Sequence, residues 1–76
     1  MPDDPYLTLG RIIGVETAGV AIVVSPGTEL DDIPGWDSIA LAGVLAEIER
    51  LNGRPADRDR IDHIRSVDDL AQLLAS

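Results

Sequence analysis

The chain has 76 residues, fourteen acidic side chains, six arginines and no cysteine, which gives a net charge of −8. This length allows one small domain with little room for a deep catalytic cleft, and the lack of cysteine excludes disulfides, thiolate nucleophiles and thiolate metal sites. The negative charge disfavours nucleic acid and anionic membranes as partners. Because no basic segment leads into an apolar run at the N-terminus, and because a chain without cysteine suits a reducing compartment, we expect a cytoplasmic protein.

The first helix is expected from about Asp4 to Glu16. Pro5 follows two aspartates and is tolerated in a first helical turn. Gly10 and Gly14 each disfavour the helix by roughly 1 kcal/mol relative to alanine, so packing must compensate. The apolar residues with i, i+3, i+4 spacing, which predict one buried stripe, are Leu9, Ile12 and Ile13.

The segment Val20–Val24 has the composition of a buried strand, since its residues are apolar and mostly β-branched. No second convincing strand is present to pair with it, so we predict an irregular apolar loop packed over the helices. The stretch Thr28–Gly35 that follows is acidic and turn-like, and we expect Leu30 and Ile33 to anchor it in the core.

The longest helical pattern runs from Ser38 to Leu51 and ends at Asn52-Gly53, a typical C-terminal signal. Asp37 is the expected N-cap, and Ser38 then falls at the first helical position. Trp36 and Leu41 have the spacing of a hydrophobic staple. The residues of this helix that we assign to the core by their spacing are Leu41, Val44, Leu45, Ile48 and Leu51.

Two further helices are expected in the C-terminal part. A short third helix would cover Asp57–His63, with Ile61 turned inward. Ser66 and Asp69 fit a capping-box pattern with aspartate in the usual glutamate position, and they open a last helix that runs to about Ala75. The sequence therefore predicts an all-α fold, a small four-helix bundle with one short helix and a long first loop.

Ser38 is the candidate functional residue, because its hydroxyl is placed where a loop becomes a helix. Helix capping is the commonest reason for a serine at this position, but Asp37 is the better cap here. An anion attached at Ser38 would lie at the positive end of the helix dipole, near unpaired amide groups.

Three stretches of the chain resemble the acyl carrier protein family, in family order. Gly35-Trp36-Asp37-Ser38-Ile39 and the helix up to Glu49 look like the family's Asp-Ser-Leu signature and second helix. Val24–Leu30 resembles the loop that leads to the serine, and Ile64–Leu70 resembles the start of the last helix. The resemblance implies a single carrier domain over residues 1–76, in a four-helix bundle of acyl-carrier type.

The resemblance also implies a cofactor and partners. Ser38 would carry 4′-phosphopantetheine, attached by a phosphopantetheinyl transferase that supplies both base and Mg²⁺. Asp37 would cap the helix and help the transferase meet the serine. The arm's thiol would then hold acyl groups as thioesters for acyl-loading and acyl-processing enzymes, and the chain itself, expected to be a monomer, would not be an enzyme.

The face of the helix beside the serine is where partners of this family dock, and here it departs from the strongly acidic pattern of housekeeping carriers. Weak charge shifts discrimination from electrostatic steering to shape, which favours a specialised fatty-acyl, polyketide or related pathway. Trp36 could be an interface anchor or a staple. The expected partner-facing residues are Trp36, Ile39, Ala42, Gly43, Ala46, Glu47, Glu49 and Arg50.

Other interpretations remain open from the residues alone. The cargo could be aminoacyl or peptidyl, or the chain could be an unmodified carrier-like interaction module. Asp31 and Asp32 offer too few oxygen ligands for a stable divalent-cation site, so we expect no metal. His63 lacks a clear acid–base partner, which makes a small metal-dependent enzyme the least favoured alternative.

Overall fold

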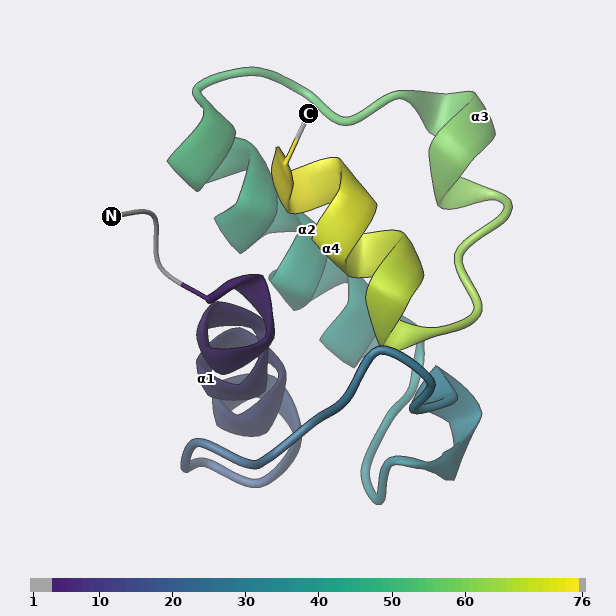
Figure 1. Ribbon diagram of the computed structural model, residues 1–76. Coiled ribbons are helices and arrows are strands. Elements are labelled where there is room, and N and C mark those ends of the chain that lie inside the picture. Colours follow the sequence, from purple (N-terminus) through teal and green to yellow (C-terminus); the bar gives the residue numbers. More distant parts are fainter. Residues whose placement is uncertain (1–3, 76) are drawn as a thin grey trace.

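The computed structural model describes residues 4–75, and within them the fold is helical (Figure 1). Three longer helices, α1 (Pro5–Thr17), α2 (Ser38–Asn52) and α4 (Val67–Ala75), pack against one another, and a single short helix, α3 (Arg58–Ile61), lies to one side. The only β-type pairing in the described part is an isolated bridge between Glu29 and Ser66. The all-α prediction is therefore confirmed.

Helix α1 begins where the sequence indicates. Asp4 is its N-cap, with a carboxylate oxygen 2.9 Å from the backbone N–H of Tyr6. The Tyr6 hydroxyl donates a 2.9 Å hydrogen bond to Asp68 on α4, which ties the first turn of α1 to the C-terminal helix. Leu9 and Ile13 are fully buried, whereas Ile12 is only partly buried at the edge of the core.

The segment Val20–Val24 is an irregular loop, as predicted, and it packs on two glycines of α1. The backbone N–H of Ile22 donates to the carbonyl of Gly10 at 3.0 Å. A β-carbon at Gly10 or Gly14 would lie 2.2 Å from the carbonyl oxygen of Ile22 or Val20, respectively. The two glycines that weaken the helix locally are thus required because the chain backbone passes directly over them.

The loop that precedes α2 is attached to the start of α4. The N–H of Leu30 donates to the carbonyl of Arg65 at 3.0 Å, and the N–H of Val67 donates to the carbonyl of Thr28 at 2.9 Å. Leu30 and Ile33 are buried and anchor this loop in the core, as their positions in the sequence predict. A short 3-10 turn, Leu30–Asp32, lies between the two anchors.

Helix α2 ends at Gly53, whose φ of 74° is left-handed and whose N–H donates to the carbonyl of Glu49 at 2.8 Å. Val44 and Ile48 are fully buried or nearly so. The assignment of Leu51 to the core is wrong, because this side chain is 48% exposed. It lies on the side of α2 that faces α1, among residues of both helices that line one groove.

The C-terminal helices differ in how well the sequence predicts them. Helix α3 is one turn long, shorter than the Asp57–His63 expected, and Ala56 and Ile64 on either side of it pack against the core. At the start of α4, the Asp69 carboxylate accepts from the N–H of Ser66 at 3.0 Å, which is one half of the predicted capping box, and from the N–H of Arg65 at 2.8 Å. The Asp69 N–H donates to the backbone carbonyl of Ser66, and not to its hydroxyl. Both hydrogen bonds to the carboxylate lower the pKa of the Asp69 carboxyl, and the bond from Arg65 has the larger effect.

One hydrophobic core joins the helices and the first loop. Its buried members are Leu9, Ile13, Leu30, Ile33, Val44, Ile48, Val67, Leu70, Ala71 and Leu73. Between residues 4 and 75 no helix combines the length and the apolar character needed to cross a bilayer.

Candidate functional site

Ser38 is the first residue of α2 and is exposed. The Asp37 carboxylate accepts a 2.8 Å hydrogen bond from the N–H of Ala40, so Asp37 is the cap and the serine is not needed for that role. Within residues 4–75 the Ser38 hydroxyl has no hydrogen-bond partner. A group esterified to it would project into solvent, so the position fits covalent attachment of a long polar arm.

The loop before Ser38 is held in place by α1. Gly35 has a φ of 83°, and a β-carbon there would lie 2.9 Å from the carbonyl oxygen of Thr17, at the end of α1. The N–H of Trp36 closes a turn on the carbonyl of Ile33 at 3.1 Å, and the Trp36 ring packs against the core. Trp36 is therefore partly buried and leads directly into the helix.

The surroundings of Ser38 combine negative charge with one exposed apolar residue. Glu29, Asp31, Asp32 and Asp37 are all exposed on the 3-10 turn and the loop around it. Ile39, next to the serine, is 80% exposed. A partner that approaches Ser38 would therefore meet acidic side chains on the loop and an apolar contact on the helix.

Apart from Trp36, the seven residues expected to face partners fall into three groups. Ile39 and Ala42 are exposed on α2 beside Ser38. Glu49 turns to the other side, where its carboxylate accepts a 2.7 Å hydrogen bond from the N–H of Ala56 and holds the loop before α3. A third group lines a groove between α2 and α1: Gly43, Ala46, Glu47 and Arg50.

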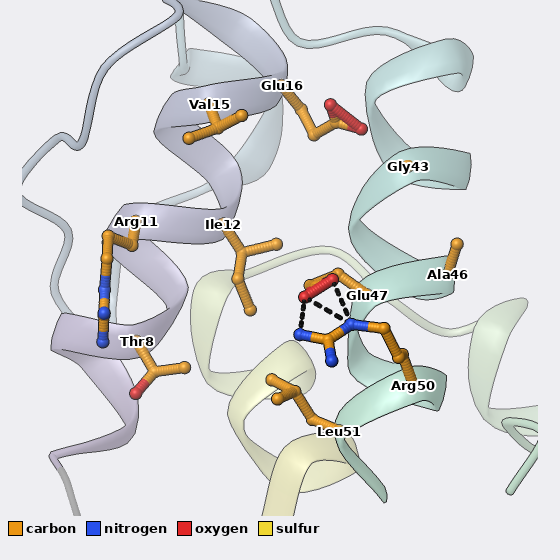
Figure 2. Close-up of a pocket in the computed structure, with 10 residues that line it drawn as sticks. All are labelled: Thr8, Arg11, Ile12, Val15, Glu16, Gly43, Ala46, Glu47, Arg50 and Leu51. Atoms are coloured by element: carbon orange, nitrogen blue, oxygen red, sulfur yellow. Dashed lines mark hydrogen bonds and ion pairs between the residues drawn. The ribbon is translucent and has the colours of Figure 1, made fainter. Parts of the chain in front are cut away.

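This groove, which we call the α1–α2 groove, has a volume of about 710 Å³. Figure 2 shows α1 and α2 side by side and antiparallel, with Glu16 opposite Gly43 at one end and Leu51 at the other. Glu47 and Arg50 form an ion pair within it. The lining residues from α1, none of which sequence reasoning assigned to a site, are Thr8, Arg11, Ile12, Val15 and Glu16.

The exposed negative charge of α2 is lower than its two glutamates suggest. Glu47 is neutralised by Arg50, whose hydrogen bonds lower the pKa of the Glu47 carboxyl. Glu49 is engaged with the backbone of Ala56. The exposed surface of the helix beyond Ser38 consists largely of small and apolar side chains, in accordance with recognition by shape.

The residues of the alternative interpretations do not assemble into a second site. His63 is exposed, and its Nδ1 lies 2.7 Å from the backbone oxygen of Asp59. Within residues 4–75 no three side chains of histidine or acidic residues are grouped so that they could hold a metal ion.

No protein-family model matches the chain. Comparison with curated proteins gives no match. Comparison with solved structures gives none either.

Proposed function

We propose that this protein is an acyl carrier protein that bears 4′-phosphopantetheine on Ser38. The observation that carries the proposal is the exposed hydroxyl at the first position of a fifteen-residue helix, left without a partner in the described structure because Asp37 caps that helix. The family resemblance of the surrounding sequence supports the same residue.

The attachment would form a bond between the Ser38 oxygen and the phosphorus of the pantetheine phosphate. The diphosphate bond of coenzyme A breaks, its adenosine-containing half leaves, and the serine proton passes to a base of the transferase. Residues of this chain contribute position: Asp37 fixes the helix start, and Gly35 and Trp36 hold the loop against α1 and the core. The unpaired amides of the first helical turn favour the phosphodiester charge.

The carrier would catalyse nothing itself. When bound, the arm supplies a thiol that holds an acyl group as a thioester, and the tether keeps that group at high effective concentration near successive partner enzymes. The lowered charge along α2 supports dedicated partners that recognise shape, in a specialised fatty-acyl, polyketide or related pathway. We propose that the protein acts as a monomer in the cytoplasm.

Intact-mass measurement after incubation with coenzyme A and a promiscuous phosphopantetheinyl transferase tests the proposal. We expect one added phosphopantetheine on the wild-type protein and none on Ser38→Ala. Ser25→Ala is the matched control, because Ser25 is also exposed but lies in the loop, where it hydrogen-bonds Thr28.

An unchanged wild-type mass, with the Ser25→Ala protein equally unmodified, would favour an unmodified interaction module. Addition that persists in Ser38→Ala would place the attachment elsewhere and refute the assignment of this residue.

A further inference from the structure

The arginines are concentrated in one stretch of the chain. Four of the six lie between residues 54 and 65, and against three aspartates they give this stretch a net charge of +1, although the whole chain carries −8. By contrast, the loop before Ser38 has four acidic side chains and no basic one between residues 29 and 37. The two stretches therefore present different charge to a partner.

Three arginines of this stretch have guanidinium groups without a described partner. Arg54, Arg58 and Arg60 are exposed, and within residues 4–75 their side chains make no hydrogen bond or ion pair. Arg50 differs from them, because it is paired with Glu47 on the same helix. A guanidinium has five N–H donors and no acceptor, and its fork matches the two oxygens of a carboxylate.

Two of these arginines line the same hollow, although they come from different parts of the chain. Arg54 follows the end of α2, where the chain crosses toward α3, and Arg60 lies on α3 itself (Figure 1). The hollow, which we call the α2–α3 hollow, has a volume of about 200 Å³. This is smaller than the roughly 300–1,000 Å³ of typical small-molecule sites, and it suits the end of a single side chain.

The two carboxylates that also line the hollow are bound to the backbone. Glu49 accepts a 2.7 Å hydrogen bond from the N–H of Ala56, and Asp57 accepts a 2.9 Å hydrogen bond from the N–H of Asp59. Within the described chain neither carboxylate forms an ion pair with an arginine of the hollow. The acidic residues therefore hold the walls of the hollow, and the arginine donors are left for another molecule.

The hollow lies at the end of α2 that is remote from Ser38. Glu49 and Asn52, which line it, follow Ser38 by eleven and fourteen residues. At 1.5 Å per residue this is about 17 and 21 Å along the helix axis. A protein that contacts the hollow therefore leaves the Ser38 hydroxyl accessible.

The charges around the hollow favour a carboxylate side chain over a polyanion. Three exposed aspartates alternate with the arginines of residues 54–65, and the whole chain carries −8, so a nucleic acid would be repelled. A phosphate dianion in the hollow would lie near the carboxylates of Glu49 and Asp57. A single carboxylate, with half that charge, meets less repulsion and still receives hydrogen bonds from Arg54 and Arg60.

From these observations we infer that the α2–α3 hollow is a docking site for an acidic segment of a partner protein, in which Arg54 and Arg60 bind the carboxylate of one glutamate or aspartate. The site does not depend on a group attached to Ser38. A partner that also reaches Ser38 would have to present a carboxylate here and basic or apolar groups at the loop. Such a charge pattern would reject partners that are basic throughout.

Titration with an acidic peptide tests the inference. A peptide of alternating glutamate and glycine is added to the ¹⁵N-labelled full chain in about 20 mM salt, where charge interactions are weakly screened. We expect the largest changes in chemical shift at the backbone N–H groups of Ala56, Asp57 and Arg60. The same peptide with glutamine in place of glutamate should cause none, and about 0.5 M salt should abolish the changes.

Two double variants remove the same charge from different places. Arg54→Gln with Arg60→Gln takes both guanidinium groups from the hollow and should weaken peptide binding about five-fold or more. Arg11→Gln with Arg58→Gln lowers the net charge equally, at exposed residues that do not line the hollow, and should change binding less than about two-fold. Circular dichroism verifies that both variants fold.

Three results would overturn the inference: no shift changes in the wild-type protein, changes centred on Ser38 or the α1–α2 groove, or equal weakening in both double variants. Ser38→Ala should bind the peptide like the wild-type protein. Failure of phosphopantetheine attachment would therefore leave this site intact, and failure of peptide binding would leave the proposed function intact.

Discussion

Asp37 fixes the position of Ser38 through one short hydrogen bond to the N–H of Ala40. Replacement of Asp37 by alanine removes this cap, and we expect it to lower the free energy of unfolding by about 1 kcal/mol, within the range of roughly 0.5–2 kcal/mol for such changes. In a domain of this size the melting temperature should fall by about 4–8 °C per kcal/mol. Asp32→Ala, at an exposed carboxylate on the neighbouring turn, should alter stability by less than about 0.5 kcal/mol.

The Asp37→Asn variant separates capping from charge. Asparagine caps helices about as well as aspartate, so this variant should unfold close to the wild-type protein. If the carboxylate also serves the transferase, as the family resemblance implies, phosphopantetheine loading of Asp37→Asn will be slower at unchanged stability. Equal loading rates would restrict Asp37 to its structural role.

At the scale of elements, the contact between α1 and the segment Val20–Val24 depends on residues without side chains. Alanine normally stabilises a helix interior by about 1 kcal/mol relative to glycine. At Gly14, however, the new methyl would meet three backbone atoms of Val20, Ala21 and Ile22 within 3 Å. We expect Gly14→Ala to lower the free energy of unfolding by about 1–3 kcal/mol, as overpacking does, measured by urea denaturation.

Gly43→Ala is the control for this effect, because the same change at Gly43 meets only the end of the flexible Glu16 side chain. It should raise stability by up to about 1 kcal/mol. If Gly14→Ala proved as stable as Gly43→Ala, the segment would not be packed on α1 as described.

These elements also show what the sequence can and cannot predict. The boundaries of α1 and α2 are marked locally by Asp4, Asp37 and Gly53, and each marker makes the hydrogen bonds expected of it. At the start of α4, Asp69 makes one of the two bonds expected of a capping box. The prediction of a loop at Val20–Val24 rests on the lack of a partner strand in the sequence, since the composition of the segment favours a strand.

The site was predictable in part. The exposure of Ser38 follows from its place beside the cap, whereas the groove depends on how α1 and α2 pack. One face of α1 can be predicted from the helical spacing of Thr8, Ile12 and Val15. The residues of α2 that lie opposite this face cannot, because they depend on how the two helices pack. The hydrogen bond between the Glu49 carboxylate and the N–H of Ala56 also depends on tertiary packing, so the sequence does not predict it.

At the scale of the whole molecule, Asp69 connects three parts of the chain. Its carboxylate accepts from the N–H groups of Arg65 and Ser66, and these two residues are paired with the loop that leads to Ser38. Hydrogen bonds to the charged form lower the pKa of Asp69 below its unfolded value of about 3.9. The resulting stabilisation is complete above that value and is lost as the pH falls through the folded pKa.

Asp69→Asn keeps a side-chain oxygen as acceptor but removes the titrating charge, so its comparison with the wild-type protein isolates the pH-dependent part. We expect the variant to unfold at lower urea concentration near pH 6, because charge-assisted hydrogen bonds are the stronger ones. The difference between the two midpoints should shrink below about pH 4, where Asp69 begins to be protonated in the unfolded chain, and it should be lost once the folded carboxyl is protonated too. Asp31→Asn is the control, because it removes only a charge, at an exposed carboxylate with no described hydrogen bond.

The midpoint difference between Asp69→Asn and the wild-type protein could instead stay constant from pH 6 to pH 3, or match that of Asp31→Asn. Either result would show that Asp69 does not hold the loop and α4 together through its charge.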